Sequence, residues 1–194
     1  LRDHGFFAFA VEEVSGDLPG YVQGEIASAR ALIEPLMLAF QVDAYEDGPI
    51  LRFRSRLKAS RPAKVIDVLA DIDGQPLWTE NRNHDADHAG EAIIGFYDQF
   101  LDYEQASSRS RRVAVTNDRV LRCDLAASLA KEMALAGAEA LLRDQFVARR
   151  SVRFDLAPFD LDVQTGDAVE LPAGPGGRFL VTRIEDGKTR HVEA

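Results

Sequence analysis

Hydrophobic and polar residues alternate most clearly near the end of the chain, at residues 151–156, where every second side chain is apolar. This period of two predicts a half-buried strand. Further β-rich runs follow, and the Asp186-Gly187 pair between two of them is a strong signal for a two-residue hairpin turn. We expect four short antiparallel strands between residues 150 and 194, and these strands need a partner layer to bury their apolar faces.

The longest run with helical spacing lies just before these strands, at residues 124–148. Leu129 and Met133 lie in the middle of its apolar stripe, and Asp124 can cap its first turn. Alanines recur along the same run and would allow close packing on a sheet. We therefore predict that a helix at residues 124–148 is the partner layer, with Leu129 and Met133 buried against the strands.

Residues 1–60 hold a second, smaller set of elements. Apolar side chains recur at helical spacing between Leu32 and Phe40, and Ser28 can cap that helix. The Asp47-Gly48 pair, with a β-rich run on each side, predicts a second hairpin. This part of the chain therefore predicts a helix followed by a hairpin.

Together these elements predict the fold class α+β and two domains. Residues 1–60 form a small α/β (helix plus hairpin) subdomain. Residues 61–194 form a domain with an antiparallel β-barrel-like sheet, covered by the long helix at residues 124–148. The barrel strands are expected at residues 91–103, 113–116 and 150–194, and loops at residues 71–90 and 107–112.

The second strand of the predicted hairpin has an unusual charge pattern. Four cations alternate with other residues, and a period of two places all four on one face of the strand. The ordinary interpretation is a solvated strand face. The functional interpretation is a basic stripe that contacts an acidic subunit or nucleic acid. The four residues are Arg52, Arg54, Arg56 and Lys58.

The composition excludes several classes of protein. Of the 194 residues 46% are hydrophobic, so the chain can build a sizeable core and is not typical of disordered proteins. A net charge of −9 argues against general binding to nucleic acid or anionic membranes, which depends on lysine and arginine. The single cysteine, Cys123, allows no internal disulfide. Because the chain starts at Leu1 without a methionine and stops in a strand-like run, we expect a fragment of a longer polypeptide.

One cluster of residues has the spacing of metal ligands. On a helix, His84 and His88 would share a face, and Asp87 lies between them. A metal-dependent hydrolase that uses His84, Asp87 and His88 is therefore an alternative function. The flanking residues are polar and lack an apolar stripe, so we expect a solvated loop without bound zinc. The sequence contains no phosphate-binding loop and no Gly-x-Ser-x-Gly motif, and we expect no cofactor.

Three groups of residues follow one another along the chain: residues 28–36 with 40–48 and 51–54, residues 96–98 with 102–105 and 111–112, and the long helix with residues 166–171, 178–179 and 183–187. In this order and spacing they resemble the phage-tail-protein domain of tail-tip (host-specificity) proteins from siphophages and alphaproteobacterial gene transfer agents. The resemblance extends from about residue 18 to residue 194. One departure is Glu104, which separates Tyr103 from Gln105, whereas the family tends to have glutamine directly after tyrosine.

The resemblance implies a structural protein of the tail tip or baseplate hub, and not an enzyme. Such hubs combine small β-barrels with α/β inserts, usually as trimers around a DNA channel at the end of the tail tube. Implied partners are other tail and baseplate proteins and, in the full-length assembly, two further copies in a homotrimer. DNA would pass through without sequence-specific binding.

The implied location is the virion tail of a phage or gene transfer agent, after synthesis in the bacterial cytoplasm. A cell-surface receptor or carbohydrate-binding module is a further alternative, because host-specificity proteins can recognise a cell surface. A cluster of exposed aromatic side chains would favour that alternative, but only 8% of the residues are aromatic.

Overall fold

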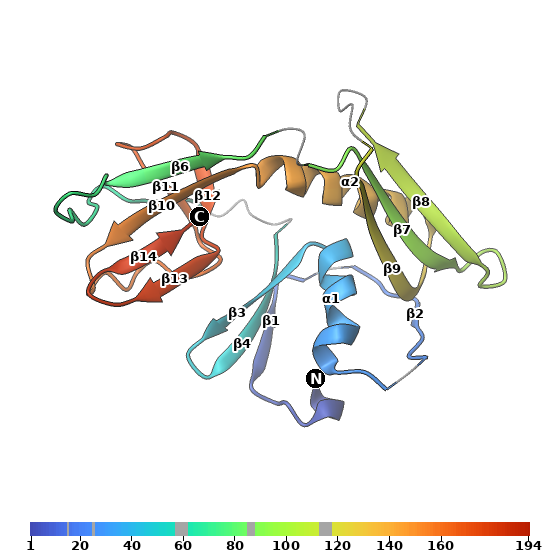
Figure 1. Ribbon diagram of the computed structural model, residues 1–194. Coiled ribbons are helices and arrows are strands. Elements are labelled where there is room, and N and C mark those ends of the chain that lie inside the picture. The colour runs from blue at the N-terminus through green and yellow to red at the C-terminus, as the bar shows by residue number, and fades with distance from the viewer. Residues whose placement is uncertain (15, 25, 57–61, 85–87, 113–117) are drawn as a thin grey trace. The chain divides into compact units, whose positions relative to one another are not determined.

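The computed structural model describes residues 1–14, 16–24, 26–56, 62–84, 88–112 and 118–194, which form two compact units (Figure 1). The first unit combines Leu1–Leu57 with His84–Val147, and the second combines Lys58–Asn83 with Ala148–Ala194. Each unit has a hydrophobic core of its own. In this division the described residues up to 56 belong to one unit with a later part of the chain, and a separate domain at residues 1–60 stays a prediction.

The N-terminal part of the first unit consists of η1 (Arg2–His4), β1 (Phe9–Glu12), α1 (Ala29–Ala39), β3 (Val42–Asp47) and β4 (Ile50–Ser55). As predicted, Ser28 caps α1, and its Oγ accepts a hydrogen bond from the Ala31 amide at 3.2 Å. β3 and β4 form the predicted hairpin across Gly48, whose φ of +58° suits a tight turn that L-residues rarely adopt. β1 pairs in parallel with the other edge of β4, which gives the order β1-β4-β3.

The rest of the first unit is a second sheet and a helix: β2 (Gly20–Tyr21), β7 (Glu91–Asp98), β8 (Gln105–Arg111), β9 (Val120–Leu129) and α2 (Lys131–Val147). The strand order is β2-β9-β7-β8, and α1 and α2 both lie on one face of this sheet (Figure 1). Alternate residues of β7 and β9, such as Ile94 and Leu125, pack there against Ala138 and Leu141 of α2. The opposite face therefore carries most of the charged residues of these strands.

The helix predicted at residues 124–148 is wrong in its first part. Residues up to Leu129 continue β9, and α2 begins only at Lys131. β9 pairs with β7 along most of its length and with β2 at Ala127 and Ser128, so sheet hydrogen bonds satisfy much of its backbone. In the structure, every second side chain between residues 121 and 127 is the more buried one, as expected for a strand. The leucines and alanines of this run also fit a helix, which hid the alternation in the sequence. Leu129 is buried as predicted, at 1% exposure, whereas Met133 is only half-buried against the same core.

The second unit consists of β5 (Lys64–Val65), β6 (Trp78–Arg82), β10 (Arg150–Leu156), β11 (Ala168–Glu170), β12 (Arg178–Leu180), β13 (Arg183–Asp186) and β14 (Arg190–Glu193). These strands form two sheets, with orders β13-β14-β10-β6 and β12-β11-β5. Both sheets contribute to one core, for example through Phe154 and Val192 of the first and Phe179 of the second. The partner layer of the C-terminal strands is therefore a second sheet, and not the predicted helix.

The predicted barrel-like sheet is not formed, because strands from residues 91–111 and 150–193 belong to different sheets. Among the described residues all four sheets are open and none closes into a barrel. The sheets are also mixed, since β1–β4, β7–β9 and β5–β11 pair in parallel. Residues 107–112, predicted as a loop, lie largely in β8, and β6 lies within the loop predicted at residues 71–90. The strand predicted at residues 113–116 lies outside the described residues.

The described part of the chain is thus an α+β fold made mostly of sheet, with two α-helices. The hairpin at Asp186-Gly187 is confirmed, because β13 and β14 pair antiparallel across it. Asp186 pairs with Arg190, however, so the loop consists of residues 187–189 and is not the predicted two-residue turn. None of the described helices is long and apolar enough to cross a membrane.

Candidate functional site

Arginines on one face of β4 form ion pairs with acidic side chains of the neighbouring strands. Arg52 binds Glu12 of β1 and also Asp47 of β3, whose Oδ2 lies 2.7 Å from its Nε. These two hydrogen bonds raise the pKa of the Arg52 guanidinium and keep it charged. Arg54 lies over the Tyr45 ring, 5.5 Å from its centre, and its Nε is 3.7 Å from Glu12. Glu12 therefore joins two of the arginines.

Arg56 connects the hairpin to α2. Its Nη1 lies 2.8 Å from Asp144 of α2, and its Nε lies 3.2 Å from Asp43 of β3. Gln41, which is 2% exposed, donates a hydrogen bond from Nε2 to the Asp144 Oδ1 at 2.6 Å. Burial raises the pKa of Asp43, nearby Asp144 raises it further, and Arg56 opposes both. This network fixes the hairpin against the long helix.

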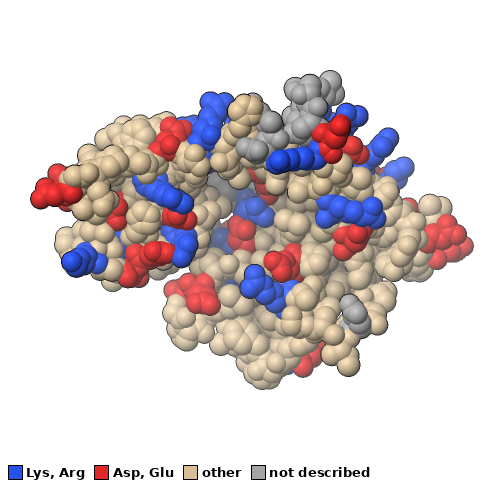
Figure 2. All heavy atoms as spheres, in the orientation of Figure 1, with Lys and Arg blue, Asp and Glu red and all other residues tan. Residues whose placement is uncertain are grey.

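The basic stripe predicted from the sequence is thus a row of paired charges, and not a solvated face. The side chains of Arg52, Arg54 and Arg56 are only 28%, 18% and 29% exposed. Lys58, the fourth member, lies outside the described residues. Figure 2 shows acidic and basic side chains interspersed over the visible face, in agreement with this pairing. A contact of the stripe with an acidic subunit stays a prediction.

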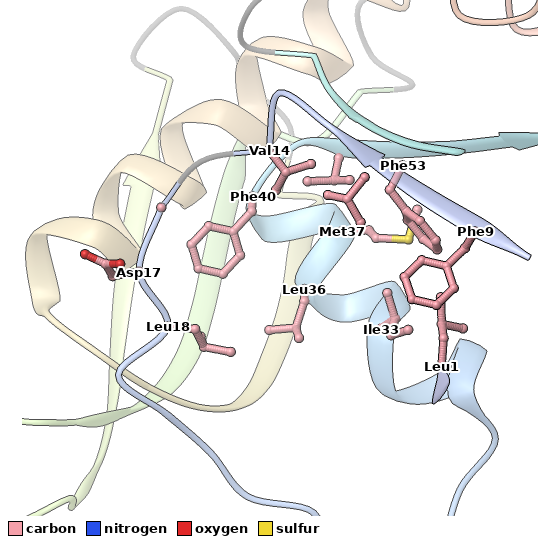
Figure 3. A pocket seen from close by; sticks show the side chains of 13 residues that line it. Leu1, Phe9, Val14, Asp17, Leu18, Ile33, Leu36, Met37, Phe40 and Phe53 are labelled. Carbon is pink, nitrogen blue, oxygen red and sulfur yellow. The ribbon is translucent and has the colours of Figure 1, made fainter. Parts of the chain in front are cut away.

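An open pocket with a volume of about 370 Å³ lies beside α1 (Figure 3). Its walls are almost entirely apolar, and Asp17 is the charged side chain among the residues that line it. The sequence predicted the apolar stripe of α1 but not that β1 and β4 would leave part of it uncovered. We call this the α1 pocket; among its lining residues are Phe9, Ile33, Leu36, Met37, Phe40 and Phe53.

The turn between β7 and β8, residues 98–104, carries exposed apolar side chains. Phe100, Leu101 and Tyr103 are 76%, 59% and 64% exposed. Sequence reasoning extended the strand through Tyr103. The missed signal was Asp98, whose buried side chain accepts a hydrogen bond from the Phe100 amide at 2.9 Å and starts a turn. We call residues 98–104 the β7–β8 tip.

A polar groove of about 580 Å³ lies on the sheet formed by β7, β8 and β9. Its floor includes Gly95, where a Cβ would lie 2.3 Å from the Asp124 carboxylate. Arg122 forms an exposed ion pair with Asp124 at 2.9 Å, and Gln105 donates a hydrogen bond to the Tyr97 hydroxyl at 3.3 Å. The groove therefore offers both polar groups and an aromatic side chain. The sequence alone did not indicate it, because its residues come from three strands.

The proposed metal cluster receives no support from geometry. Asp87 lies outside the described residues, and no group of three potential metal ligands occurs among the residues that the structure does describe, which include His84 and His88. Cys123 is buried on the helix-covered face of β9, and its Sγ donates a weak hydrogen bond to the Pro35 carbonyl at 3.6 Å. Burial and, to a lesser degree, Asp124 raise the pKa of this thiol, which disfavours the reactive thiolate. Cys123 therefore packs as an apolar residue.

Solved structures similar to this chain include several tail proteins. A chain of the native gene transfer agent particle is 28% identical, with a TM-score of 0.74 over 84% of this chain. The 43 kDa tail protein of prophage MuSo2 from Shewanella oneidensis is 12% identical, with a TM-score of 0.59 over 95% of this chain. A tail protein from Neisseria meningitidis MC58 is 11% identical, with a TM-score of 0.59 over 96%. The last two likenesses show the fold alone.

This chain spans only part of each of those proteins. It covers 38% of the gene transfer agent chain, 59% of the Shewanella protein and 60% of the Neisseria protein. None of the curated proteins matches it. Residues 28–184, however, match a single family along most of the chain. The chain therefore belongs to the family described as "Putative phage tail protein", and it is a structural component of a phage-like tail.

Proposed function

We propose that this chain is a module of the tail-tip or baseplate hub, and that it helps to join the tail tube to the tip around the path of the DNA. The observation that carries the proposal is the similarity to a chain of the gene transfer agent particle over 84% of this chain. In the assembled hub, three copies of the full-length protein form a closed ring.

The charge of the chain supports a conduit. With a net charge of −9, the protein repels the phosphate backbone on average, so DNA would pass without being held. The arginines in and directly after β4 would not hold the DNA, because carboxylates of the same chain already pair with them. A passage lined by unpaired cations would instead slow the DNA.

The same pairing supports a role for the β4 face in subunit contact. Burying an unpaired guanidinium costs several kcal/mol, whereas ion pairs that already have their partners enter an interface at lower cost. We therefore place Arg52, Arg54, Arg56 and Lys58 against a neighbouring subunit and away from the lumen.

The test is a cryo-electron microscopy map of intact particles at side-chain resolution. The expected result is threefold density for this domain around the tail axis, with the β4 face at a subunit boundary. Density for the domain away from the axis would contradict the hub assignment. The four cations pointing into the channel would contradict the placement of β4 alone.

A second candidate function is recognition of a cell-surface carbohydrate. The polar groove supports it, because Tyr97 offers an aromatic ring while Arg122 and Asp124 offer donors and acceptors for sugar hydroxyls. Glycan-array binding by the wild-type protein that disappears in Asp124→Ala, while the matched exposed change Glu104→Ala retains it, would favour this function. Equal signals from both variants would exclude the groove as the binding site.

A further inference from the structure

The β7–β8 tip is a rigid apolar projection. The Asp98 amide donates to the Glu104 carbonyl at 2.9 Å, and the Tyr103 amide donates back to the Asp98 carbonyl at 3.0 Å. Asp102 and Tyr103 both have positive φ, at 48° and 59°, a conformation that non-glycine residues rarely adopt. This hydrogen-bonded, strained turn holds Phe100 and Tyr103 outward, so little conformational entropy remains to be lost on binding.

The exposed apolar area of the tip is large for a single turn. At about 150–250 Å² for a buried aromatic side chain, Phe100, Leu101 and Tyr103 together expose on the order of 400 Å². Exposed apolar patches of a few hundred Å² commonly mark a binding surface. Because the tip is convex, its partner must be concave and apolar, which fits a protein pocket better than a solvated sugar.

The α1 pocket has the shape and chemistry that the tip requires. It is hollow and apolar, and Phe9, Ile33 and Met37 on its walls are only half-buried. Figure 3 shows the side chains of Met37, Phe53 and Phe9 pointing toward one another at one end of this pocket. In Figure 1, the β7–β8 turn and the N-terminal end of α1 lie apart within the first unit, so the tip does not fill the pocket of its own copy.

We propose that the β7–β8 tip of one copy inserts into the α1 pocket of the next copy, a head-to-tail contact that rests on the proposed ring. Because donor and acceptor surfaces differ, such a contact continues from copy to copy and closes a ring when the rotation allows. The tip buries on the order of 400 Å² of apolar surface, about a quarter of the roughly 1,600 Å² of a typical specific interface, and the apolar walls of the pocket add a smaller area. The polar surroundings of the tip and the pocket supply the remainder.

Charge complementarity favours this orientation. The tip carries Asp102 and Glu104 and no basic residue. At one edge of the α1 pocket, the Arg2 guanidinium lies over the Phe9 ring, 5.8 Å from its centre, where an incoming carboxylate can reach it. Asp17 lies elsewhere on the pocket wall, so the acidic flank of the tip is directed toward Arg2.

Mixed cross-linking of two variants, each with one added cysteine, tests the contact. Full-length Phe100→Cys and full-length Ile33→Cys are treated with a short bis-maleimide, separately and as an equimolar mixture. We expect covalent dimers in the mixture alone, because only unlike copies bring residues 100 and 33 together. Wild-type protein is the control for Cys123, which is 5% exposed and should not react.

Three other results of this experiment would contradict the tip-to-pocket contact. Dimers of Phe100→Cys with itself would show a tip-to-tip contact and overturn the proposal. A native mass spectrum with oligomers but no cross-link in the mixture would overturn the tip contact and leave the ring standing. Monomers at every concentration would overturn both.

A second variant separates assembly from receptor binding. Phe100→Ser/Leu101→Ser should weaken association of the full-length protein about 30-fold or more, as expected on losing a binding hot spot. Phe159→Ser, which changes an 83% exposed aromatic residue of the second unit, should leave association unchanged. Unchanged association of the tip variant with loss of particle adsorption to cells would assign the tip to a surface receptor and overturn the proposal.

Discussion

Leu129 is the residue whose replacement most directly tests the layer assignment in the first unit. Its side chain is 1% exposed at the end of β9, in the core that β7 and β9 share with α2. Leu129→Ala removes three carbon atoms, a loss of about 2.4 kcal/mol at roughly 0.8 kcal/mol per buried methylene. The cavity that remains adds to this, so the free energy of unfolding should fall by about 2–5 kcal/mol.

Urea unfolding measures this loss, and the chain offers a probe for each unit. Far-UV circular dichroism follows the whole chain, whereas fluorescence of Trp78, the single tryptophan, follows the second unit. A lower midpoint with an unchanged slope identifies a loss of stability. Leu38→Ala is the matched control, because Leu38 is 46% exposed on α1, and it should cost about 1 kcal/mol or less. A loss below about 0.5 kcal/mol for Leu129→Ala would refute the packing of β9 against α2.

Three other predictions follow from the sites. Asp98→Ala should lower the free energy of unfolding by about 1–3 kcal/mol, since the Phe100 amide loses its acceptor. Asp98→Asn keeps an acceptor oxygen and should lower it less, and equal losses in the two variants would show that this hydrogen bond does not stabilise the turn. Because the Asp43 pKa is raised above its ordinary value of 3.8, the folded state holds the proton more tightly, and the free energy of unfolding should fall as pH rises above about 4. In Asp43→Asn this fall should be absent, and an equal dependence of the free energy of unfolding on pH in the two proteins would contradict the prediction. Elemental analysis after dialysis should find no stoichiometric zinc, and the idea fails if zinc remains and chelation lowers the melting temperature.

The sequence by itself determined those elements whose signals are local. Ser28 capped a helix because a side-chain oxygen next to free amides needs nothing from the rest of the chain. The Asp47-Gly48 and Asp186-Gly187 pairs predicted the positions of two hairpins, because adjacent residues determine where a chain can turn. Alternation predicted β10 for the same reason, since a period of two places alternate side chains on opposite faces.

Only the tertiary structure decided between helix and strand at residues 120–129. A leucine- and alanine-rich run satisfies its backbone equally well in a helix or between two strands, and the pairing partners of β9 are distant in sequence. The same holds for the three arginines in and directly after β4. Their period of two was visible, but Glu12 and Asp144 reach them through a parallel strand and a helix that lie 40 or more positions away.

The exposed β7–β8 tip and the open α1 pocket were also decided by the tertiary structure. An apolar residue such as Phe100 or Met37 has the same side chain whether it fills the core or faces solvent. What differs is whether another element covers it, and that depends on how distant strands and helices pack. Local chemistry therefore determined where the elements turn and begin, whereas long-range packing decided which apolar side chains stay exposed and which charged side chains are paired.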